Sequence, residues 1–206
     1  MNVFICKNWF MVDFMNKKDE KSENEEISEY YAIQSQIMIP YLPTPSKLIR
    51  KVLQSLNFKE SAKLYDLGAG DGRVIVMAAE EFGFDSVGYE INKTLYKQAL
   101  KLIAELPEDI QNKTKMIHGD MFSVNCSDAN ILFFYITPKS HRYLNHIISQ
   151  CEKGTNIVFI RFQPSREFCR ELQLQLVKKI EDKKQELNKA TAAYIYVIKR
   201  VKFESN

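Results

Sequence analysis

The residues most able to do chemistry form a short run in which an acid precedes three alternating glycines. Residues 64–73 read LYDLGAGDGR, so that Asp66 is followed by Gly68, Gly70 and Gly72. Glycines at such positions allow positive φ and let the backbone approach a ligand with no Cβ in the way. The run follows an apolar stretch and precedes a helical one, which predicts a ligand-binding turn at the end of a strand.

The spacing of the glycines discriminates between nucleotide ligands. A dinucleotide fingerprint requires a glycine where Arg73 stands, and a P-loop requires a Gly-Lys-Ser/Thr sequence that is absent. The pattern Asp-x-Gly-x-Gly-x-Gly instead suits the amino-acid moiety of S-adenosylmethionine. The Asp66 carboxylate would pair with the ammonium group of that ligand.

Two further acids end the next apolar runs. Glu90 ends the run VGYE, where a carboxylate can accept hydrogen bonds from both ribose hydroxyls of an adenosine. HGDMF, residues 118–122, places Asp120 near the expected position of an adenine amino group. Three such signals at three successive strand ends favour an S-adenosylmethionine site over unrelated turn glycines and solvated acids.

The elements that must position these residues alternate along the chain. Continuous apolar runs separated by helical stretches are typical of parallel strands with crossover helices. Thr44 and Pro45 predict a helix start ahead of them, and two strand-like segments near the end predict a hairpin. We therefore expect an α/β, Rossmann-like, doubly wound seven-stranded sheet, mostly parallel with an antiparallel C-terminal hairpin. The expected strands are 64–67, 86–90, 115–120, 130–136, 157–162, 174–183 and 192–200, and the helical stretches include 72–82, 92–106 and 138–151.

Composition narrows the classes of protein further. The chain has 206 residues and a formal net charge of only +3, which argues against a protein that coats nucleic acid. Its four cysteines and three histidines lack metal-ligand spacing, so no metal site is expected. The N-terminus is too interrupted by charge for a membrane span. A cytoplasmic monomer is the expectation.

Longer stretches of the chain resemble one family of class I, seven-β-strand S-adenosylmethionine-dependent methyltransferases. The resemblance covers about residues 38–200 and rests on IPYLPTPSKLIRKVL, DLGAGDGR, GYEIN, ILFFYITP and IVFIRFQP. That family comprises the archaeal protein-lysine methyltransferases and the mitochondrial lysine methyltransferases of the adenine nucleotide translocase and ATP synthase c-subunit. The resemblance implies an enzyme that methylates the ε-amines of lysines exposed on a protein partner. It implies an N-terminal arm over 1–38, partly helical with a charged linker, and a methyltransferase domain over 39–206.

The resemblance also implies roles for individual residues. Tyr135, at the end of the fourth strand, would face the transferring methyl group as the catalytic residue. The sequence departs from many relatives at Ile136, Thr137, Phe159 and Ile160, which bears on the acceptor pocket. The residues implied to hold S-adenosylmethionine are Tyr41, Thr44, Asp66, Gly68, Gly70, Glu90, Asp120 and Met121.

Two other functions stay open at this point. The segment 135–138 lacks the Pro-Pro-aromatic motif of amino-group methylation on bases, and neither Cys126 nor Cys151 is placed to act as the nucleophile of cytosine C5 methylation. A structured-RNA methyltransferase acting at another atom remains the main alternative. A protein that binds S-adenosylmethionine without catalysis is the third.

Overall fold

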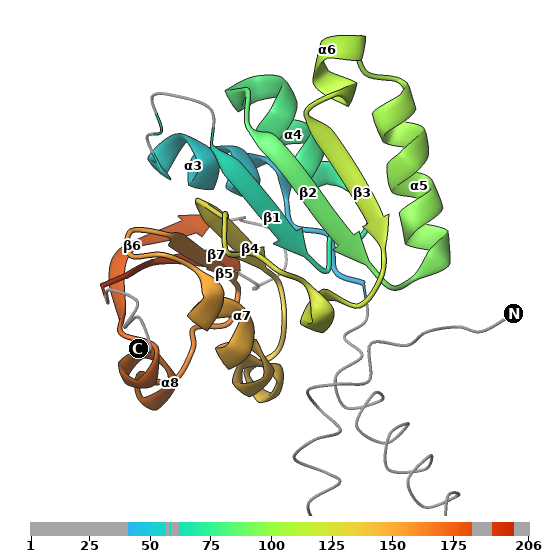
Figure 1. Cartoon of the computed structure of the whole chain (residues 1–206). Coiled ribbons are helices and arrows are strands. Elements are labelled where there is room, and N and C mark those ends of the chain that lie inside the picture. The colour runs from blue at the N-terminus through green and yellow to red at the C-terminus, as the bar shows by residue number, and fades with distance from the viewer. Residues whose placement is uncertain (1–40, 57, 59–61, 183–190, 200–206) are drawn as a thin grey trace, which may run out of the picture. The chain divides into compact units, whose positions relative to one another are not determined.

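The computed structural model describes residues 41–56, 58, 62–182 and 191–199. The N-terminal arm predicted for residues 1–38 lies outside these described ranges. Within them, helices and strands alternate through most of the chain (Figure 1). The strands are β1 (Lys63–Leu67), β2 (Asp85–Glu90), β3 (Thr114–His118), β4 (Ile131–Phe134), β5 (Asn156–Ile160), β6 (Leu174–Asp182) and β7 (Thr191–Ile198). The α-helices are α3 (Ser46–Leu56), α4 (Arg73–Phe82), α5 (Lys93–Ala104), α6 (Glu108–Gln111), α7 (Asn145–Gln150) and α8 (Arg166–Glu171), and the 3₁₀ helices are η1 (Met121–Ser123) and η2 (Pro138–Leu144).

The strands form one seven-stranded sheet in the order β3-β2-β1-β4-β5-β7-β6. Strands β1 to β5 pair in parallel, while β7 runs antiparallel to both β5 and β6. The predicted α/β fold with an antiparallel C-terminal hairpin is therefore confirmed. The hairpin joins the sheet through β7, so that β6 is left as the edge strand.

Different helices cover the two faces of the sheet. On one face, α3 and α4 pack on a core that includes Val158 and Ile160 of β5. On the other face, the alternate residue Phe159 contacts the rings of His141 in η2 and Phe168 in α8. Figure 1 shows α4 and α5 beside β1–β3, with α7 and α8 beside β4–β7. Within the described ranges, no helix is long and apolar enough to span a bilayer.

Several predicted elements end earlier or are built differently than expected. The strands predicted at 115–120 and 157–162 end at His118 and Ile160. The strand predicted at 130–136 stops at Phe134, because its last partner on β1 is Leu67, where β1 gives way to the glycine turn. The helix predicted at 138–151 is a 3₁₀ helix followed by the short α7. Its first turn is closed by the amide of Ser140 donating to the Thr137 carbonyl at 2.9 Å, which is 3₁₀ spacing.

The helix predicted to start at Thr44 begins slightly later. The carbonyl of Pro45 accepts the amides of Leu48 and Ile49 at 2.9 and 3.1 Å. Pro45 therefore occupies the capping position, and α3 proper starts at Ser46. Thr44 is buried ahead of the helix, with 5% of its surface exposed.

A buried histidine makes the stability of this fold depend on pH. The ring of His141 is 3% exposed, and its Nε2 atom has no hydrogen-bond partner within the described ranges. Burial lowers the pKa of His141 to about 4, and a backbone hydrogen bond with Ile136 only partly opposes this. The unfolded chain takes up the proton near pH 6.5, whereas the folded chain does not until near pH 4.

We therefore expect the free energy of unfolding to fall as the pH drops from about 6.5 to about 4, by up to roughly 1.4 kcal/mol per pH unit from this group. Urea unfolding of wild type and His141→Leu at several pH values measures it. The variant should lack that part of the slope, whatever its absolute stability. Parallel pH dependences in the two proteins would contradict the assignment.

Candidate active site

The site is at the carboxyl edge of the parallel strands, where the strand order reverses. Strands β2 and β3 lie on one side of β1, and β4 and β5 lie on the other. In open α/β sheets, ligands bind in the crevice that this reversal leaves beyond the carboxyl ends of the strands. Seven of the predicted residues lie in or soon after β1, β2, β3 or β4, namely Asp66, Gly68, Gly70, Glu90, Asp120, Met121 and Tyr135.

The glycine turn after β1 is fastened to the neighbouring strand. The amides of Gly68 and Ala69 donate to the Tyr89 carbonyl at 3.0 and 2.9 Å. Gly70 has a φ of +58°, and a Cβ there would lie 2.5 Å from a ring carbon of Tyr41. Glycine is required at this position because the Tyr41 ring packs directly on the backbone. The structure thus brings the predicted residue Tyr41 to the turn.

Glu90 ties the end of β2 to this turn. Its Oε2 atom accepts the amide of Gly70 at 2.8 Å, and its Oε1 atom accepts the amide of Asn92 at 2.7 Å. The residue is 9% exposed. An ionised carboxylate offers about four acceptor positions, so each oxygen retains capacity for a further donor such as a ribose hydroxyl.

Asp66 is an almost fully buried acid with no cationic partner. It is 4% exposed, and no described side chain or amide donates to its carboxylate. Burial, with further contributions from the charges of Glu90 and Asp71, raises the pKa of Asp66 to about 8. Such a carboxyl group is costly to ionise alone and ionises readily beside a bound cation.

Arg73 joins the turn to the segment that precedes α3. Its Nη2 atom donates to Asp71 at 2.6 Å and to the Tyr41 hydroxyl at 3.3 Å, and its Nη1 atom donates to the Thr44 carbonyl at 3.4 Å. Burial raises the pKa of Asp71, but the hydrogen bonds from Arg73 and Tyr41 outweigh it and lower the pKa overall. In the sequence, Arg73 indicated only that the glycine pattern is not a dinucleotide fingerprint. The signal for its role was the acid two residues before it, whereas its distant partners left no trace in the local pattern.

Asp120 and Met121 lie on the other side of the turn. The Asp120 carboxylate caps η1 by accepting the amide of Phe122 at 2.9 Å. The Met121 sulfur lies 3.7 Å from where a Cβ on Gly68 would stand. Met121 therefore borders the glycine turn, while one oxygen of Asp120 is already engaged with the backbone.

Tyr135 follows β4 directly and meets residues that follow β5. Its hydroxyl accepts a hydrogen bond of 3.4 Å from Arg161, and its ring centroid lies 6.5 Å from that of Phe162. Arg161 has a φ of +68°, in the left-handed region that non-glycine residues rarely adopt. From the sequence, Arg161 and Phe162 were expected only to pack or to line a substrate channel, since backbone strain and a partner beyond the adjacent strand cannot be recognised from residue types alone.

The donor set fits S-adenosylmethionine. Buried acids stand at β1 and β2, a backbone turn free of Cβ atoms lies between them, and aromatic side chains stand at β4 and β5. Within the described ranges, no three His, Cys, Asp or Glu side chains are grouped to hold a metal ion. Cys126 is buried, and burial raises the pKa of its thiol, which disfavours a nucleophilic thiolate.

Comparison with known proteins agrees with this chemistry. The model of the ANTKMT methyltransferase domain matches residues 66–166. A protein-lysine N-methyltransferase of Saccharolobus islandicus is 30% identical over 162 residues, which cover 78% of this chain and 94% of that protein. The lysine N-methyltransferase of the ATP synthase c-subunit from Mus musculus is 27% identical over 61% of this chain, and the match spans 50% of that protein.

Solved structures give the same fold. An RNA methyltransferase from Salinibacter ruber in complex with S-adenosyl-L-homocysteine is 28% identical, with a TM-score of 0.65 over 80% of this chain and 98% of that chain. The M1A22 tRNA methyltransferase of B. subtilis, at 13% identity and a TM-score of 0.56 over 75% of this chain and 66% of that chain, shares the fold alone. The extent of the archaeal match places this chain in the family of that protein-lysine N-methyltransferase, and the acids and glycines at the sheet edge agree with an S-adenosylmethionine-dependent methyltransferase.

Proposed function

We propose that this enzyme transfers methyl groups to the ε-amines of lysines on proteins. The single observation that carries the proposal is the match to nearly the whole length of an archaeal protein-lysine N-methyltransferase. The animal relatives, which are lysine N-methyltransferases by name, support lysine as the class of acceptor. The chain matches only about half of the length of the mouse relative, so we extend the acceptor class to this enzyme and not the ATP synthase substrate.

The cofactor roles follow from the carboxyl-edge geometry. We assign Asp66 to the ammonium group of S-adenosylmethionine, because it is a buried acid without a counter-ion. Glu90 would accept the ribose hydroxyls with the acceptor capacity that Gly70 and Asn92 leave unused. Gly68, Met121 and Asp120 would border the adenosine, and the buried Thr44 would act by holding its own segment against the turn.

The acceptor lysine must reach the site as a neutral amine. A lysine of ordinary pKa near 10.4 is neutral in only about 0.04% of molecules at pH 7. When bound, S-adenosylmethionine supplies a methyl group on a sulfonium sulfur, and alignment of the amine with it provides much of the acceleration. We assign to the Tyr135 hydroxyl, which accepts a hydrogen bond from Arg161, the role of orienting an amine N–H. The Arg161 charge disfavours an ammonium beside it, because like charges raise the cost of the protonated form.

A second candidate function rests on one specific observation. The Salinibacter ruber structure, whose name gives RNA as the substrate, is similar over 98% of that chain. Methyl transfer to a structured RNA therefore remains the alternative acceptor, and an enzyme-like site that binds cofactor without transfer is the third. The location of transferred label distinguishes all three.

The role of Glu90 is tested by removing its carboxylate. Glu90→Ala should weaken S-adenosylmethionine binding at least tenfold, since hydrogen bonds to a charged group contribute on the order of 1.5–3 kcal/mol each. Glu90→Gln, which keeps one acceptor oxygen, should lose less. Titration calorimetry gives the Kd values, and the exposed α4 acid in Glu80→Ala is the matched control. Unchanged affinity in a folded Glu90→Ala protein, checked by melting, would remove the assignment.

The role of Asp66 is tested by the pH dependence of binding. Below about pH 8 the free enzyme holds Asp66 protonated, so binding an ammonium must release a proton. Above about pH 8 the ligand's α-amino group is itself deprotonated. Affinity should therefore peak near pH 8 and fall towards tenfold per unit on each side.

Asp66→Asn should flatten the acid side of this profile. Methylthioadenosine, which lacks the amino-acid moiety, is the control ligand and should bind with little pH dependence. A wild-type profile that is flat between pH 6 and 8 would show that Asp66 does not meet the ammonium.

The acceptor class is tested by the location of the label. With labelled S-adenosylmethionine and a cell lysate, label should appear on lysine peptides by mass spectrometry and survive ribonuclease. Initial rates should climb between about pH 7 and 9, because each unit raises the neutral amine roughly tenfold below its pKa. Tyr135→Phe should lower kcat more than cofactor affinity. Label that follows RNA and disappears with ribonuclease would establish the alternative, and no label with intact binding would establish the silent protein.

A further inference from the structure

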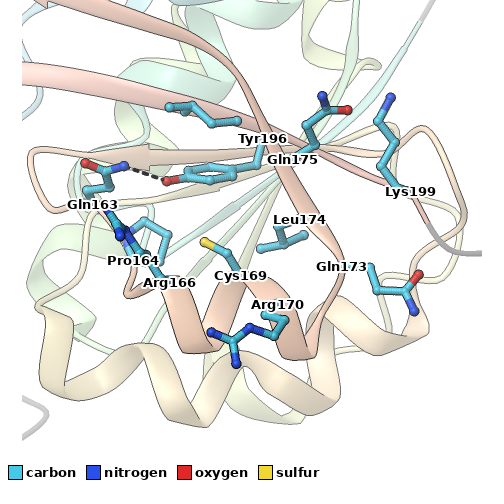
Figure 2. Close-up of a pocket in the computed structure, with 11 residues that line it drawn as sticks. Gln163, Pro164, Arg166, Cys169, Arg170, Gln173, Leu174, Gln175, Tyr196 and Lys199 are labelled. Atoms are coloured by element: carbon cyan, nitrogen blue, oxygen red, sulfur yellow. Dashed lines mark hydrogen bonds between the residues drawn. The ribbon is translucent and has the colours of Figure 1, made fainter.

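A hollow of about 570 Å³ lies between α8 and the β6–β7 pair, away from the glycine turn (Figure 2). It lies on the η2, α7 and α8 face of the sheet, at the edge formed by β6. We call it the α8 groove and define it by Arg166, Arg170, Leu174, Gln175, Tyr196 and Lys199. None of these residues was used for cofactor binding or methyl transfer.

The groove carries three cations that have no counter-ion among the residues that the structure describes. Arg166, Arg170 and Lys199 are all exposed, and within the described ranges none has a carboxylate at ion-pair distance. The acids of α8, Glu167 and Glu171, do not line the groove. Glu171 instead accepts a hydrogen bond from Asn145 in α7. Among the described residues, no acid neutralises the positive charge of the groove.

Both arginines of the short helix α8 line the groove, whereas its two glutamates do not. Arg166 and Arg170 are four residues apart, and so are Glu167 and Glu171. Residues at this spacing are neighbours on a helix, where like charges repel. The two arginines both border the hollow, with Lys199 across from them on the strand side in Figure 2. An anion bound between them would relieve this repulsion.

The uncharged surface of the groove favours a peptide over a nucleic acid. Its floor includes Leu174 and Tyr196, and the partly exposed Leu176 lies at its rim. Gln175 offers an amide that can pair with a peptide backbone. The Tyr196 ring is only 2% exposed, so it cannot stack on a base as single-strand binders require. The small net charge of +3 likewise supplies no extended track for phosphates.

The groove is connected along the chain to the acceptor side of the site. Gln163 borders the groove and donates to the Tyr196 hydroxyl at 3.1 Å. It directly follows Phe162, whose ring lies 6.5 Å from that of Tyr135. We propose that the α8 groove binds an acidic segment of the protein substrate and so selects lysines that have carboxylates nearby in sequence. This inference rests on the proposed lysine function.

The first test measures binding without catalysis. A fluorescent peptide with a central lysine and glutamates on one flank is compared with the same peptide carrying glutamines, by anisotropy with the full chain at low salt. The acidic peptide should bind about five- to tenfold more tightly. Arg166→Gln with Arg170→Gln should abolish the difference, and Lys199→Gln alone should reduce it.

The chain offers a matched control for the charge removed. Lys97 and Lys101 are exposed, four residues apart on α5, and α5 packs on β2 and β3 at the opposite side of the sheet. Lys97→Gln with Lys101→Gln should leave the acidic preference intact. Melting temperatures and S-adenosylmethionine affinity should be unchanged in both double variants.

The second test measures turnover. In wild type, the acidic peptide should have a KM five- to tenfold lower than the glutamine peptide at similar kcat, and the groove double variant should equalise the two KM values. Equal binding of both peptides, or a preference that survives in the groove variant, would overturn the groove proposal while lysine methylation stands. Binding of a labelled uridine homopolymer that depends on the arginines, with no binding of the acidic peptide, would overturn it in favour of RNA. If the wild-type enzyme methylates neither peptide but still binds the acidic one more tightly, the lysine function is wrong, whereas the preference of the groove for acidic peptides stands.

Discussion

The carboxylate of Glu90 holds together two parts of the chain that must stay in register for any ligand to bind. One oxygen accepts the amide of Gly70 in the turn after β1, and the other accepts the amide of Asn92 before α5. The turn cannot shift without leaving a buried carboxylate oxygen or amide unpaired, which is expensive in a site with little solvent. The acid that we assign to the ribose therefore also sets the shape of the glycine turn, which is why a test of its binding role needs a variant that stays folded.

The charge of Glu90 makes it harder to ionise its neighbour Asp66. Asp66 is buried nearby without a donor, and its pKa rises to about 8 because of burial and the charges of Glu90 and Asp71. Asp71 has Arg73 as its partner, but Asp66 has none among the described residues. A ligand that brings a positive charge to this edge resolves the imbalance. We assign a cationic ligand to this site because the described residues leave Asp66 without a counter-ion.

The sequence predicted the fold and the meeting of several residues at one sheet edge better than it predicted contacts between distant side chains, for physical reasons. Asp66, Gly70 and Glu90 stand at the ends of apolar runs, and parallel strands bring such ends to one edge whatever the details of packing. Tyr41 and Arg73 are different, since their contact joins segments about thirty positions apart and depends on side-chain reach rather than periodicity. The hydrogen bond between them could not be predicted from local sequence patterns. The predicted length of β4 was also wrong, because β4 stops where its partner β1 ends, and the first half of the helix predicted at 138–151 is 3₁₀ rather than α.

Arg161 shows how the C-terminal hairpin contributes to the acceptor side. Its amide donates to the Ala192 carbonyl of β7 at 2.6 Å, and its φ of +68° turns the chain out of β5 directly after Ile160. A non-glycine residue in this region costs on the order of 1–2 kcal/mol relative to a right-handed conformation, and glycine would avoid most of that cost. The side chain offsets part of it through contacts with the Tyr135 hydroxyl and the Phe162 ring. The turn at Arg161, which contacts Tyr135, leads the chain on to Gln163 and then to α8. In the sheet, β7 lies between β5 and β6. The acceptor side of the site and the α8 groove are thus two ends of one segment whose position is set by antiparallel pairing with β7.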